Sequence, residues 1–502
     1  MTPKTPFPLA SKVTGLFALA LAASYCQATH AVGKDPGYCW NTLSEGVKQK
    51  QSTLQPPSVA SNGKHVWVAW HESQTIQVSA WDGKSWSSLP SLPPGPTGSY
   101  DAVIRANSAG DVYIAWRAVT CETDILVARW TGQAWQELGS PRAEDSKCGT
   151  YATNASMEMD EQGYPVVAWE SGRKDARSVR IAKWTGTAWH QIGTKIPTSS
   201  KAYSLEVSLA LDKNGRMLVA WVDGTEVNSY IRVANWNEAK WIDLGSTATG
   251  HLTRGQEARG PKLVALPNQA ALLTWLDRGK KQSTLAFARW TGKEWQSVAA
   301  LTSPSSSEMR PWLPSLALAK GATPLLAWSA ETTGLTSSIY VRRLTAQGWQ
   351  PVLDNIYLAK NASDVENATL AMGLNEDFNL LWSESGEDGS RIQVANAHPC
   401  AAGEVAVIPP KRRPRQDDWP RTVDEAVNLI LIKLDDASKA QVKSTARADL
   451  VKFHRGWGMG IRNSYGLWGG NTDLLKSCGD DKVIHPESCS AVIIEHVWQK
   501  LQ

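Results

Sequence analysis

The sequence lacks a large excess of charge of either sign, and it lacks a long apolar segment. Its 52 Lys and Arg nearly balance 48 Asp and Glu, giving a formal net charge of +4 at pH 7. This balance argues against nucleic acid or an anionic membrane surface as the main partner. No stretch is long enough to span a bilayer. The apolar run at residues 13–23 follows Lys4 and Lys12 and precedes small residues, so we predict that residues 1–31 form a secretory signal peptide.

Cysteines are few, and none has the CxxC spacing of a zinc site. Without a histidine cluster beside them, we expect neither a metal nor a cofactor. Removal of the signal peptide leaves six cysteines, an even number that predicts three disulfides in a periplasmic or extracellular protein. For six cysteines the sequence alone allows 15 pairings.

Phenylalanine is scarce, with 5 residues against 25 tryptophans, and the tryptophans repeat. Short apolar runs that end in Trp recur along the chain at intervals of 46 to 54 residues. The seven runs are VWVAW (66–70), VYIAW (112–116), PVVAW (165–169), MLVAW (217–221), ALLTW (271–275), PLLAW (324–328) and FNLLW (378–382). A period near 50 residues predicts a propeller or another repeat array. The apolar fraction of 42% permits a large core and excludes wholesale disorder.

A second apolar strand follows each run, and in most repeats a tight turn between two tryptophans comes next. VARWTGQAW (127–135) and FARWTGKEW (287–295) show the W-x-G-x-x-W form, in which Gly supplies the positive φ of a hairpin turn. With one strand before each run, every repeat holds four strands. We therefore predict an all-β seven-bladed propeller over residues 37–400, in which most tryptophans pack between blades.

The seventh repeat stops at Cys400 without a fourth strand, whereas the N-terminal GYCWNTLSEG (37–46) resembles the fourth strand of the other repeats. Alignment of Trp40 with Trp135 places Cys39 beside Cys400. This arrangement predicts that an N-terminal strand closes the last blade through a Cys39–Cys400 disulfide. Cys121 and Cys148 map to one rim and are expected to pair, which leaves Cys478 for Cys489.

Long connections between the repeats, at 87–99, 138–150, 245–258 and 299–309, all map to one rim, where propellers commonly bind ligands. Acidic residues follow the second strands on this rim, and Tyr or Arg residues begin the first strands nearest the axis. These candidate ligand-binding residues are Tyr100, Tyr151, Tyr203, Arg259, Arg310, Glu72, Glu170, Asp223, Asp277 and Glu384. A structural interpretation stands beside the functional one: the acids are solvated turn residues and the tyrosines pack the axis.

The repeats, with segments such as LALDKNGRMLVAW (209–221) and ARWTGKEW (288–295), resemble bacterial propeller repeats of the sialidase-like and fucose-lectin-like kind. The resemblance covers residues 37–400 and is architectural. Sialidases carry S-x-D-x-G-x-x-W boxes, three substrate-binding arginines and a tyrosine nucleophile. The boxes are absent here, and only Arg259 and Arg310 begin inner strands. We therefore assign no catalytic residue by resemblance.

The chain changes character after Cys400. Residues 401–420 are Pro-rich and basic and are expected to be a linker. Residues 421–502 predict a small helical domain, with helices from a Thr422–Glu425 capping box to about 434, over 437–454 and over 488–501. GMGIRNSYGLW (458–468) and IHPESCSAVII (484–494) resemble a small uncharacterised bacterial domain with an I-R-N-x-x-x-L-W and H-P-x-x-x-S pattern.

The polar residues of this pattern have two interpretations. His454, Arg462, Asn463 and His485 form a candidate polar site. Alternatively, Arg462 and Asn463 tie the central loop to helix ends, and His485 caps the last helix. No nucleophile–base pair marks a catalytic centre here.

These observations favour an exported, monomeric binding protein whose propeller rim recognises a glycan or a protein, with no catalysis assigned. The alternative is a sialidase-like glycoside hydrolase acting at the propeller axis. Three arginines and a Tyr–Glu pair around one pocket would favour the enzyme, whereas an axis filled by apolar side chains would exclude it. A third hypothesis makes the helical domain the functional part and the propeller its scaffold.

Overall fold

The computed structural model describes residues 38–502 with internal gaps. The gaps are residues 44–45, 50–54, 93–97, 120–122, 143–150, 173–176, 195, 199–205, 226–227, 247–256, 280–282, 299–300, 302–308, 333–336, 355–361, 374–376, 387–388, 401–418, 435, 454–456 and 469. The expected signal peptide, most of the expected linker, the Cys121–Cys148 pair, Tyr203 and His454 lie outside the described residues. Among the described helices, none combines the length and the apolar character needed to cross a membrane.

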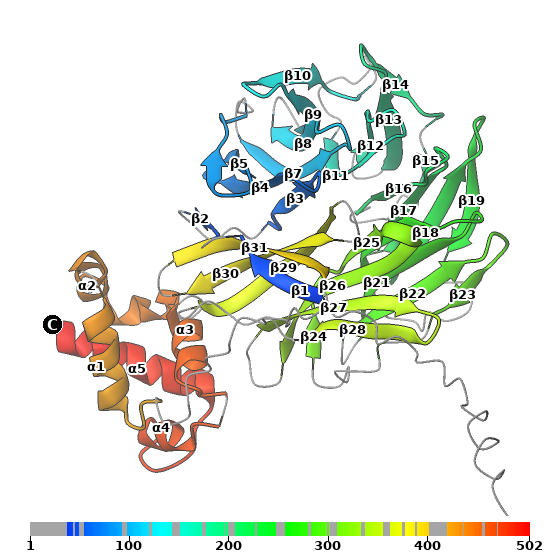
Figure 1. The fold of residues 1–502 in the computed structure, drawn as a ribbon. Coiled ribbons are helices and arrows are strands. Elements are labelled where there is room, and N and C mark those ends of the chain that lie inside the picture. Colours follow the sequence, from blue (N-terminus) through cyan, green and yellow to red (C-terminus); the bar gives the residue numbers. More distant parts are fainter. Residues whose placement is uncertain are drawn as a thin grey trace, which may run out of the picture.

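The described residues up to Pro399 are almost entirely antiparallel β-structure (Figure 1). We divide it into units of consecutive antiparallel strands, numbered in chain order. Unit 1 contains β3 (Ser58–Ser61), β4 (Val66–Glu72), β5 (Thr75–Trp81) and β6 (Trp86–Ser88). Unit 2 contains β7 (Ser99–Ala106), β8 (Val112–Val119), β9 (Thr123–Trp130) and β10 (Trp135–Gly139). Unit 3 contains β11 (Tyr151–Met159), β12 (Pro165–Gly172), β13 (Ser178–Trp184), β14 (Trp189–Gln191) and β15 (Ile196–Pro197).

The next two units belong to one sheet. Unit 4 contains β16 (Ser208–Leu211), β17 (Met217–Thr225), β18 (Asn228–Trp236) and β19 (Trp241–Ser246). Unit 5 contains β20 (Glu257–Ala265), β21 (Ala271–Arg278), β22 (Ser283–Trp290) and β23 (Trp295–Ser297). A parallel pairing of Ser229 with Glu257 joins them.

The last two units complete the β-region. Unit 6 contains β24 (Met309–Pro311), β25 (Ser315–Ala319), the 3₁₀ turn η2 (Lys320–Ala322), β26 (Thr323–Thr332), β27 (Ser337–Thr345) and β28 (Gly348–Asp354). Unit 7 contains β29 (Ala362–Met372), β30 (Phe378–Gly386) and β31 (Gly389–Pro399), and the N-terminal strands β1 (Tyr38–Thr42) and β2 (Val47–Gln49) pair with β31.

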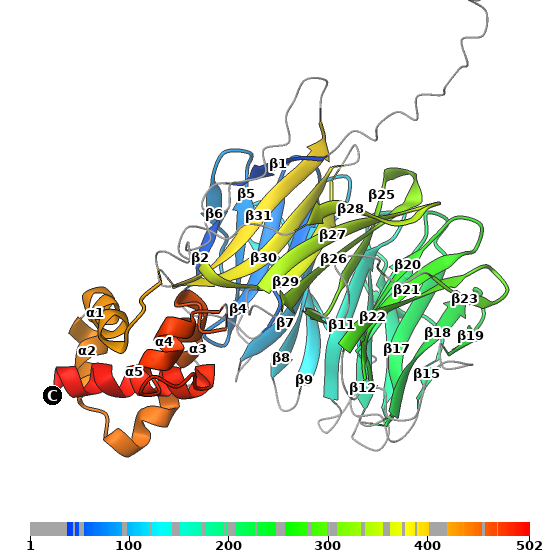
Figure 2. The ribbon, with the colours of Figure 1, turned by 90° about the horizontal axis from the view of Figure 1, so that it is seen from below.

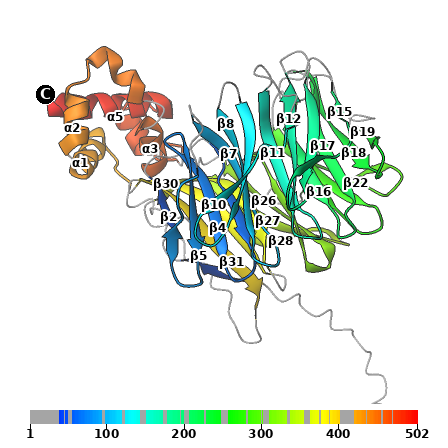
Figure 3. The ribbon, with the colours of Figure 1, turned by 90° about the horizontal axis from the view of Figure 1, so that it is seen from above.

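The innermost strands of the units form a closed ring. Each contacts the inner strand of the next unit, in the order β3, β7, β11, β16, β20, β25 and β29, and β29 contacts β3. A central cavity of about 310 Å³ is lined by all of these strands. Figures 2 and 3 show the same strands after a 90° turn from the view of Figure 1, from below and from above that view. Residues far apart in sequence therefore meet at one axis.

The tryptophans that end the second strands pack between units, as their repetition predicted. Trp116 of unit 2 is fully buried and shares a core cluster with Ala69 and Ile76 of unit 1. Trp169, Trp221 and Trp328 are also among the largest fully buried side chains. Their burial excludes these four as stacking platforms for a sugar. It is their packing area that stabilises the interfaces between units.

Tryptophans of the third and fourth strands face each other across the hairpins. In unit 2, Trp130 pairs with Trp135, and the ring centroids are 5.2 Å apart. Equivalent pairs occur in units 1, 3, 4 and 5, with centroids 5.3 to 5.6 Å apart. The fourth-strand tryptophan also donates its indole N–H to a main-chain oxygen of the preceding unit, as from Trp189 to Leu138 at 2.9 Å. One side chain thus closes a hairpin and joins two units.

The N-terminal strand closes unit 7 in the register that the sequence alignment predicted. β1 is antiparallel to β31, with Trp40 opposite Ala397. The structure links Cys39 to Cys400, residues 361 positions apart in the sequence. Because β1 and β29–β31 come from opposite ends of the β-region, their pairing closes the ring covalently and by hydrogen bonds.

The C-terminal region forms a small helical domain with its own core. It contains α1 (Val423–Lys433), α2 (Asp436–Lys443), the 3₁₀ helix η4 (Arg447–Phe453), α3 (Trp457–Ser464), α4 (Thr472–Ser477) and α5 (Pro486–Leu501). α5 contacts every other helix, and a Cys478–Cys489 disulfide ties its start to the end of α4. The domain lies beside unit 7, where α3 contacts β29 (Figures 1 and 2).

The expected helix over 437–454 is wrong in its extent. α2 ends at Lys443, where the Ser444 and Thr445 hydroxyls both donate to the main-chain oxygen of Gln441, and η4 follows. Such local side-chain bonds compete with helix continuation. The indole of Trp498 also donates to the main-chain oxygen of Thr445 at 2.8 Å, which fixes the break.

Candidate functional site

The ring has two rims. At the loop rim the inner strands begin and the second strands end, and at the hairpin rim lie the turns between paired tryptophans. The long connections expected at the loop rim all include residues outside the described part of the chain. The described residues of this rim come from the strand ends, and they hold the most unusual backbone of the β-region.

The inner strands share a β-bulge near the loop rim. Their pairing with the second strands shifts between Tyr100 and Val103, and again at the same place in units 3, 5 and 7. One residue with positive φ occupies this position in each of five units. These bulge residues are Asp101 (φ 53°), Asn154 (φ 53°), Glu206 (φ 38°), Gly260 (φ 54°) and Asn367 (φ 60°). Non-glycine residues with such φ values are uncommon and cluster at binding sites, as do bulges.

The candidate tyrosines and arginines stand at two different levels of the inner strands, which corrects their expected equivalence. Tyr100 and Arg259 pair with the residue directly after the buried second-strand tryptophan. Tyr151 and Arg310 pair two positions further out. Both levels precede the bulge in sequence, and Tyr100 and Arg259 lie directly beside it. The side chain of Arg310 and all of Tyr203 lie outside the described part.

A first polar cluster joins units 1 and 2. Arg117 donates to Asp101 at 2.6 Å, and its guanidinium lies 4.8 Å from the ring centroid of Tyr100. The ring of Tyr100 also stacks on the imidazole of His71 from unit 1, with ring centroids 4.8 Å apart. Burial lowers the pKa of His71, with Asp101 acting against the shift. This cluster therefore combines the Asp101 carboxylate, which Arg117 holds in place, with the imidazole of His71, whose burial favours the neutral form.

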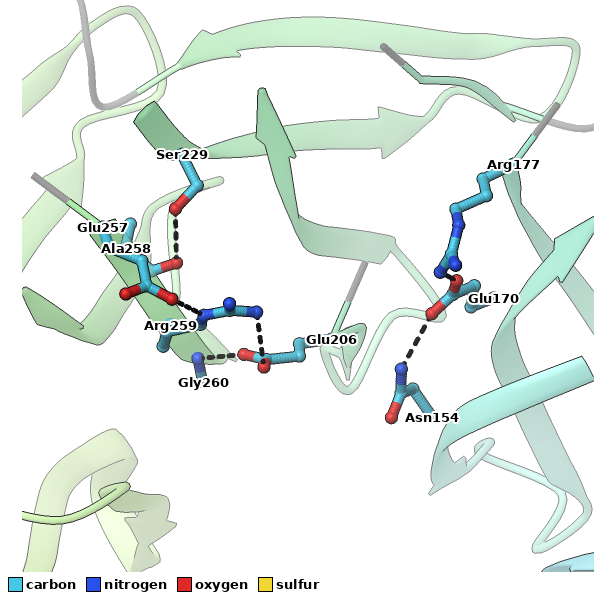
Figure 4. Close-up of polar contacts among 9 residues, drawn as sticks. All are labelled: Asn154, Glu170, Arg177, Glu206, Ser229, Glu257, Ala258, Arg259 and Gly260. Atoms are coloured by element: carbon cyan, nitrogen blue, oxygen red, sulfur yellow. Dashed lines mark hydrogen bonds and ion pairs between the residues drawn. The ribbon is translucent and has the colours of Figure 1, made fainter. Parts of the chain in front are cut away.

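A second polar cluster lies in unit 3 (Figure 4). Glu170 is buried and accepts a hydrogen bond from the bulge residue Asn154 at 2.8 Å. Arg177 forms an ion pair with the same carboxylate. Because both oxygens of Glu170 are engaged, this carboxylate positions Asn154 and Arg177 at the rim.

A third cluster joins units 4 and 5 and appears in the same view (Figure 4). The bulge residue Glu206 accepts from the backbone N–H of Gly260 at 2.5 Å, and its other oxygen lies 3.3 Å from Arg259. Glu257 forms a second ion pair with Arg259. The two carboxylates hold the guanidinium in place, since a carboxylate on each side fixes its planar fork.

The candidate acids are mostly buried, so the interpretation as solvated turn residues is wrong for Glu72, Glu170, Asp223 and Glu384. Asp223 lies 3.5 Å from Arg232. Glu384 accepts from the Trp382 indole at 2.8 Å and from Gln393 at 3.3 Å. Burial raises the pKa of the remaining acid, Asp277, and its Oδ1 has no hydrogen-bond partner among the described residues.

The central cavity is lined mainly by small and apolar side chains. Its charged lining consists of Arg105 and Glu158, which form a 3.2 Å ion pair across units 2 and 3. Lys262 of unit 5 lies within electrostatic range of Arg105 and Glu206, and burial lowers its pKa. Among the described lining residues of the cavity, Arg105 is the one arginine, so the three-arginine arrangement of a sialidase is not found there.

Sequence reasoning missed two features of the loop rim, an exposed tryptophan and the positive-φ bulges. Trp312, which follows β24, is 49% exposed, and Leu313 beside it packs against Gly260. Tyr151, which the sequence did offer as a candidate, is 50% exposed on the same rim. Trp312 stands outside the repeating tryptophan positions, and that departure was the available signal. The positive-φ bulges had no comparable signal, because four of the five residues are not glycine.

Two of the four candidate polar residues of the helical domain, Arg462 and His485, have described side chains, and both make structural contacts. Arg462 donates to Ser490 at 2.8 Å inside the core, and His485 accepts from the N–H of Glu487 as the cap of α5. His485 also packs edge-on against Trp468, with centroids 5.1 Å apart. The described part of the I-R-N-x-x-x-L-W and H-P-x-x-x-S pattern thus joins α3 to α5. The Asn463 side chain lies outside the described part.

Residues 419–501 match the model of a domain of unknown function, DUF6794. The match covers the helical domain and leaves the β-region unassigned. No curated protein sequence matches the chain.

Several solved structures are similar in fold. An ulvan lyase, a polysaccharide lyase, has a TM-score of 0.47 at 9% identity, covering 70% of this chain and 93% of that one. The Aleuria aurantia lectin, solved with α-methyl-L-fucoside, has a TM-score of 0.40 at 14% identity, covering 61% and 95%. The WD40 domain of Toxoplasma gondii coronin has a TM-score of 0.46 at 12% identity, covering 77% and 90%. These neighbours are propeller folds, and each is too distant to transfer a function.

Proposed function

We propose that residues 37–400 form a seven-bladed β-propeller that binds a glycan at the centre of its loop rim. Units 1 to 7 are then the blades, and the positive-φ bulge residues surround the mouth of the axis. The observation that carries the proposal is the polar bulge position repeated in Asp101, Asn154, Glu206 and Asn367. A backbone conformation that costs energy in several units at once is understandable if it aims polar side chains at a ligand.

The chemistry of the mouth suits a sugar. Sugar hydroxyls both donate and accept hydrogen bonds, and the three polar clusters offer carboxylates, guanidinium groups and an amide in fixed positions. Trp312 and Tyr151 add exposed aromatic surface on the same rim, against which an apolar sugar face can pack. A protein ligand would favour a broader apolar surface than these two side chains provide.

A glycan array tests this function. The purified mature chain is applied together with Trp312→Ala and Val483→Ala, the latter a truncation of an exposed apolar residue in the helical domain. We expect saturable binding by the wild type and Val483→Ala, and at least tenfold weaker binding by Trp312→Ala. Absence of glycan binding by the wild type would overturn the proposal and favour a protein ligand.

We further propose that residues 1–31 are removed on export and that residues 401–420 link the propeller to the helical domain. The disulfides and the absence of a membrane-spanning helix among the described residues are compatible with export. Mass spectrometry of the secreted or periplasmic chain should show a new N-terminus after Ala28 or Ala31. A full-length mass would contradict processing.

A further inference from the structure

A serine joins neighbouring inner strands at one repeated position. In four units, this serine accepts a hydrogen bond from a backbone N–H of the next unit. The bonds run from Ile104 to Ser58 (3.1 Å), from Leu209 to Ser156 (3.0 Å), from Leu263 to Ser208 (3.1 Å) and from Leu370 to Ser315 (3.0 Å). In each case the donor is the backbone N–H of the residue that directly follows the equivalent position in the inner strand of the next unit. The bond is therefore a regular part of the ring.

The other three units carry Val103, Lys262 and Thr369 at this position, and Lys262 of unit 5 is the one charged residue among the seven. The residue is two positions after the bulge residue Gly260, as Ser156 and Ser208 are after Asn154 and Glu206, and it pairs with Thr274 where these serines pair with Ala. An ammonium only donates, so it cannot accept the N–H of Leu316 in the next unit. The opposing Thr274 hydroxyl is buried and has no partner among the described residues. A charge at this repeated inner position, opposite a hydroxyl without a partner among the described residues, is expected where function overrides packing.

Lys262 directly precedes the residues of unit 5 that line the central cavity. It is within electrostatic range of Arg105 in unit 2 and Glu206 in unit 4, although the residue itself belongs to unit 5. Glu206 is engaged by Arg259 and Gly260, and Arg105 is paired with Glu158. No described residue forms a hydrogen bond or an ion pair with Lys262.

A partly buried cation without a partner destabilises the folded state. Burial correspondingly lowers the pKa of Lys262. A ligand anion at this position would supply the missing charge and would also draw on Arg105 at the same axis. Because the lysine is just below the bulge residues, such an anion would reach it through the mouth.

We propose that Lys262 binds an anionic group, a carboxylate or a sulfate ester, carried by the glycan. This inference rests on the proposed glycan-binding function and names its ligand class: acidic saccharides are preferred over neutral ones. The glycan's uncharged rings remain at the bulge residues and Trp312, while its acidic group enters the axis.

The test compares the wild type with Lys262→Ser and Lys240→Ser on an array of neutral, uronate-containing and sulfated glycans. Lys262→Ser introduces the residue that four other units carry, so it should fold. Lys240→Ser removes the same charge from an exposed turn at the hairpin rim. We expect Lys262→Ser to bind acidic glycans at least tenfold more weakly than the wild type while still binding neutral glycans. Lys240→Ser should bind both classes as the wild type does. The uronate and sulfate members identify which anion is bound.

Retention of acidic glycans by Lys262→Ser would overturn the inference, as would a wild type that binds neutral glycans alone; both results leave the glycan-binding function standing. A wild type that binds no glycan would overturn the function and this inference with it. Thermal melting gives a second readout. Lys262→Ser should melt at or above the wild-type temperature, and a clear decrease would instead assign Lys262 a structural role.

Discussion

The indole N–H of Trp241 donates a 3.0 Å hydrogen bond to the main-chain oxygen of Ile192, which belongs to the preceding unit. Units 1, 2, 3 and 5 make the same bond from the equivalent tryptophan, at 2.9 to 3.0 Å. These bonds explain why Trp, rather than the scarce Phe, recurs at the start of the fourth strands.

Replacing Trp241 by Phe should lower the free energy of unfolding by more than the loss of ring area alone. The lost hydrogen bond adds about 1 kcal/mol, because the part-buried main-chain oxygen of Ile192 loses this donor. Trp349 is the matched control, because its indole Nε1 is buried without a hydrogen-bond partner among the described residues. Denaturant unfolding should show a larger loss for Trp241→Phe than for Trp349→Phe. Equal losses would deny the bond a role in stability.

Removing the Cys39–Cys400 disulfide should destabilise the β-region strongly. The bond closes a loop between residues 361 positions apart, and the chain-entropy relation gives about 6 kcal/mol for a loop of this size. The Cys39→Ser/Cys400→Ser double variant should lose tryptophan fluorescence at a markedly lower temperature. A Cys478→Ser/Cys489→Ser variant, which opens an 11-position loop in the helical domain, should leave that transition nearly unchanged. An unchanged transition in the first variant would mean that β1 docks by strand pairing alone.

Asp277→Asn should stabilise the protein at neutral pH. Burial raises the pKa of Asp277, so the folded state holds its proton more tightly than the unfolded state. Stability therefore falls as pH rises from the ordinary value of 3.8 through the raised value. The variant should gain about 1–3 kcal/mol at pH 7, the usual cost of a buried unsatisfied group, and lose this pH dependence.

Asp82 provides the contrasting control for the pH series. Backbone N–H groups of Ser85 and Lys84 lower the pKa of this exposed carboxyl, so its contribution is lost as pH falls. Asp82→Asn should therefore give no gain at pH 7. A destabilised Asp277→Asn variant would show that the ionised carboxylate is engaged in the fold.

Ser490→Ala should destabilise the helical domain by about 1–3 kcal/mol, because it leaves the buried Arg462 guanidinium without its hydroxyl acceptor. Val451→Ala in η4 is the comparison, at a side chain that is 70% exposed. Helical circular dichroism during thermal unfolding measures the effect. If both variants melt alike, the link between α3 and α5 does not depend on this bond.

Much of the β-region could be predicted from its periodic residues. The W-x-G-x-x-W segments specify hairpins because Gly132 and its equivalents adopt the positive φ that the turn requires. The match of Trp40 to the fourth strands gave the register of β1 against β31. These features depend on local turn chemistry and on a repeated side chain, which a sequence displays directly.

The candidate site was harder to predict, for physical reasons. The bulges at Asp101 and Asn154 come from pairing with the second strand, and a local sequence does not specify them. The burial of Glu170 and Glu384 depends on partners elsewhere in the fold. α3 was missed because Gly458 and Gly460 oppose helix formation, which packing of Ile461 in the core overcomes.

The central claim is that the bulge residues are kept for a ligand rather than for the fold. Asn367→Gly tests it most directly, because glycine adopts the positive φ of 60° without strain while removing the amide. Calorimetric titration with a glycan identified on the array should show at least tenfold weaker binding, together with a melting temperature close to that of the wild type. Unchanged affinity with a lowered melting temperature would contradict the claim and make the bulge a structural element.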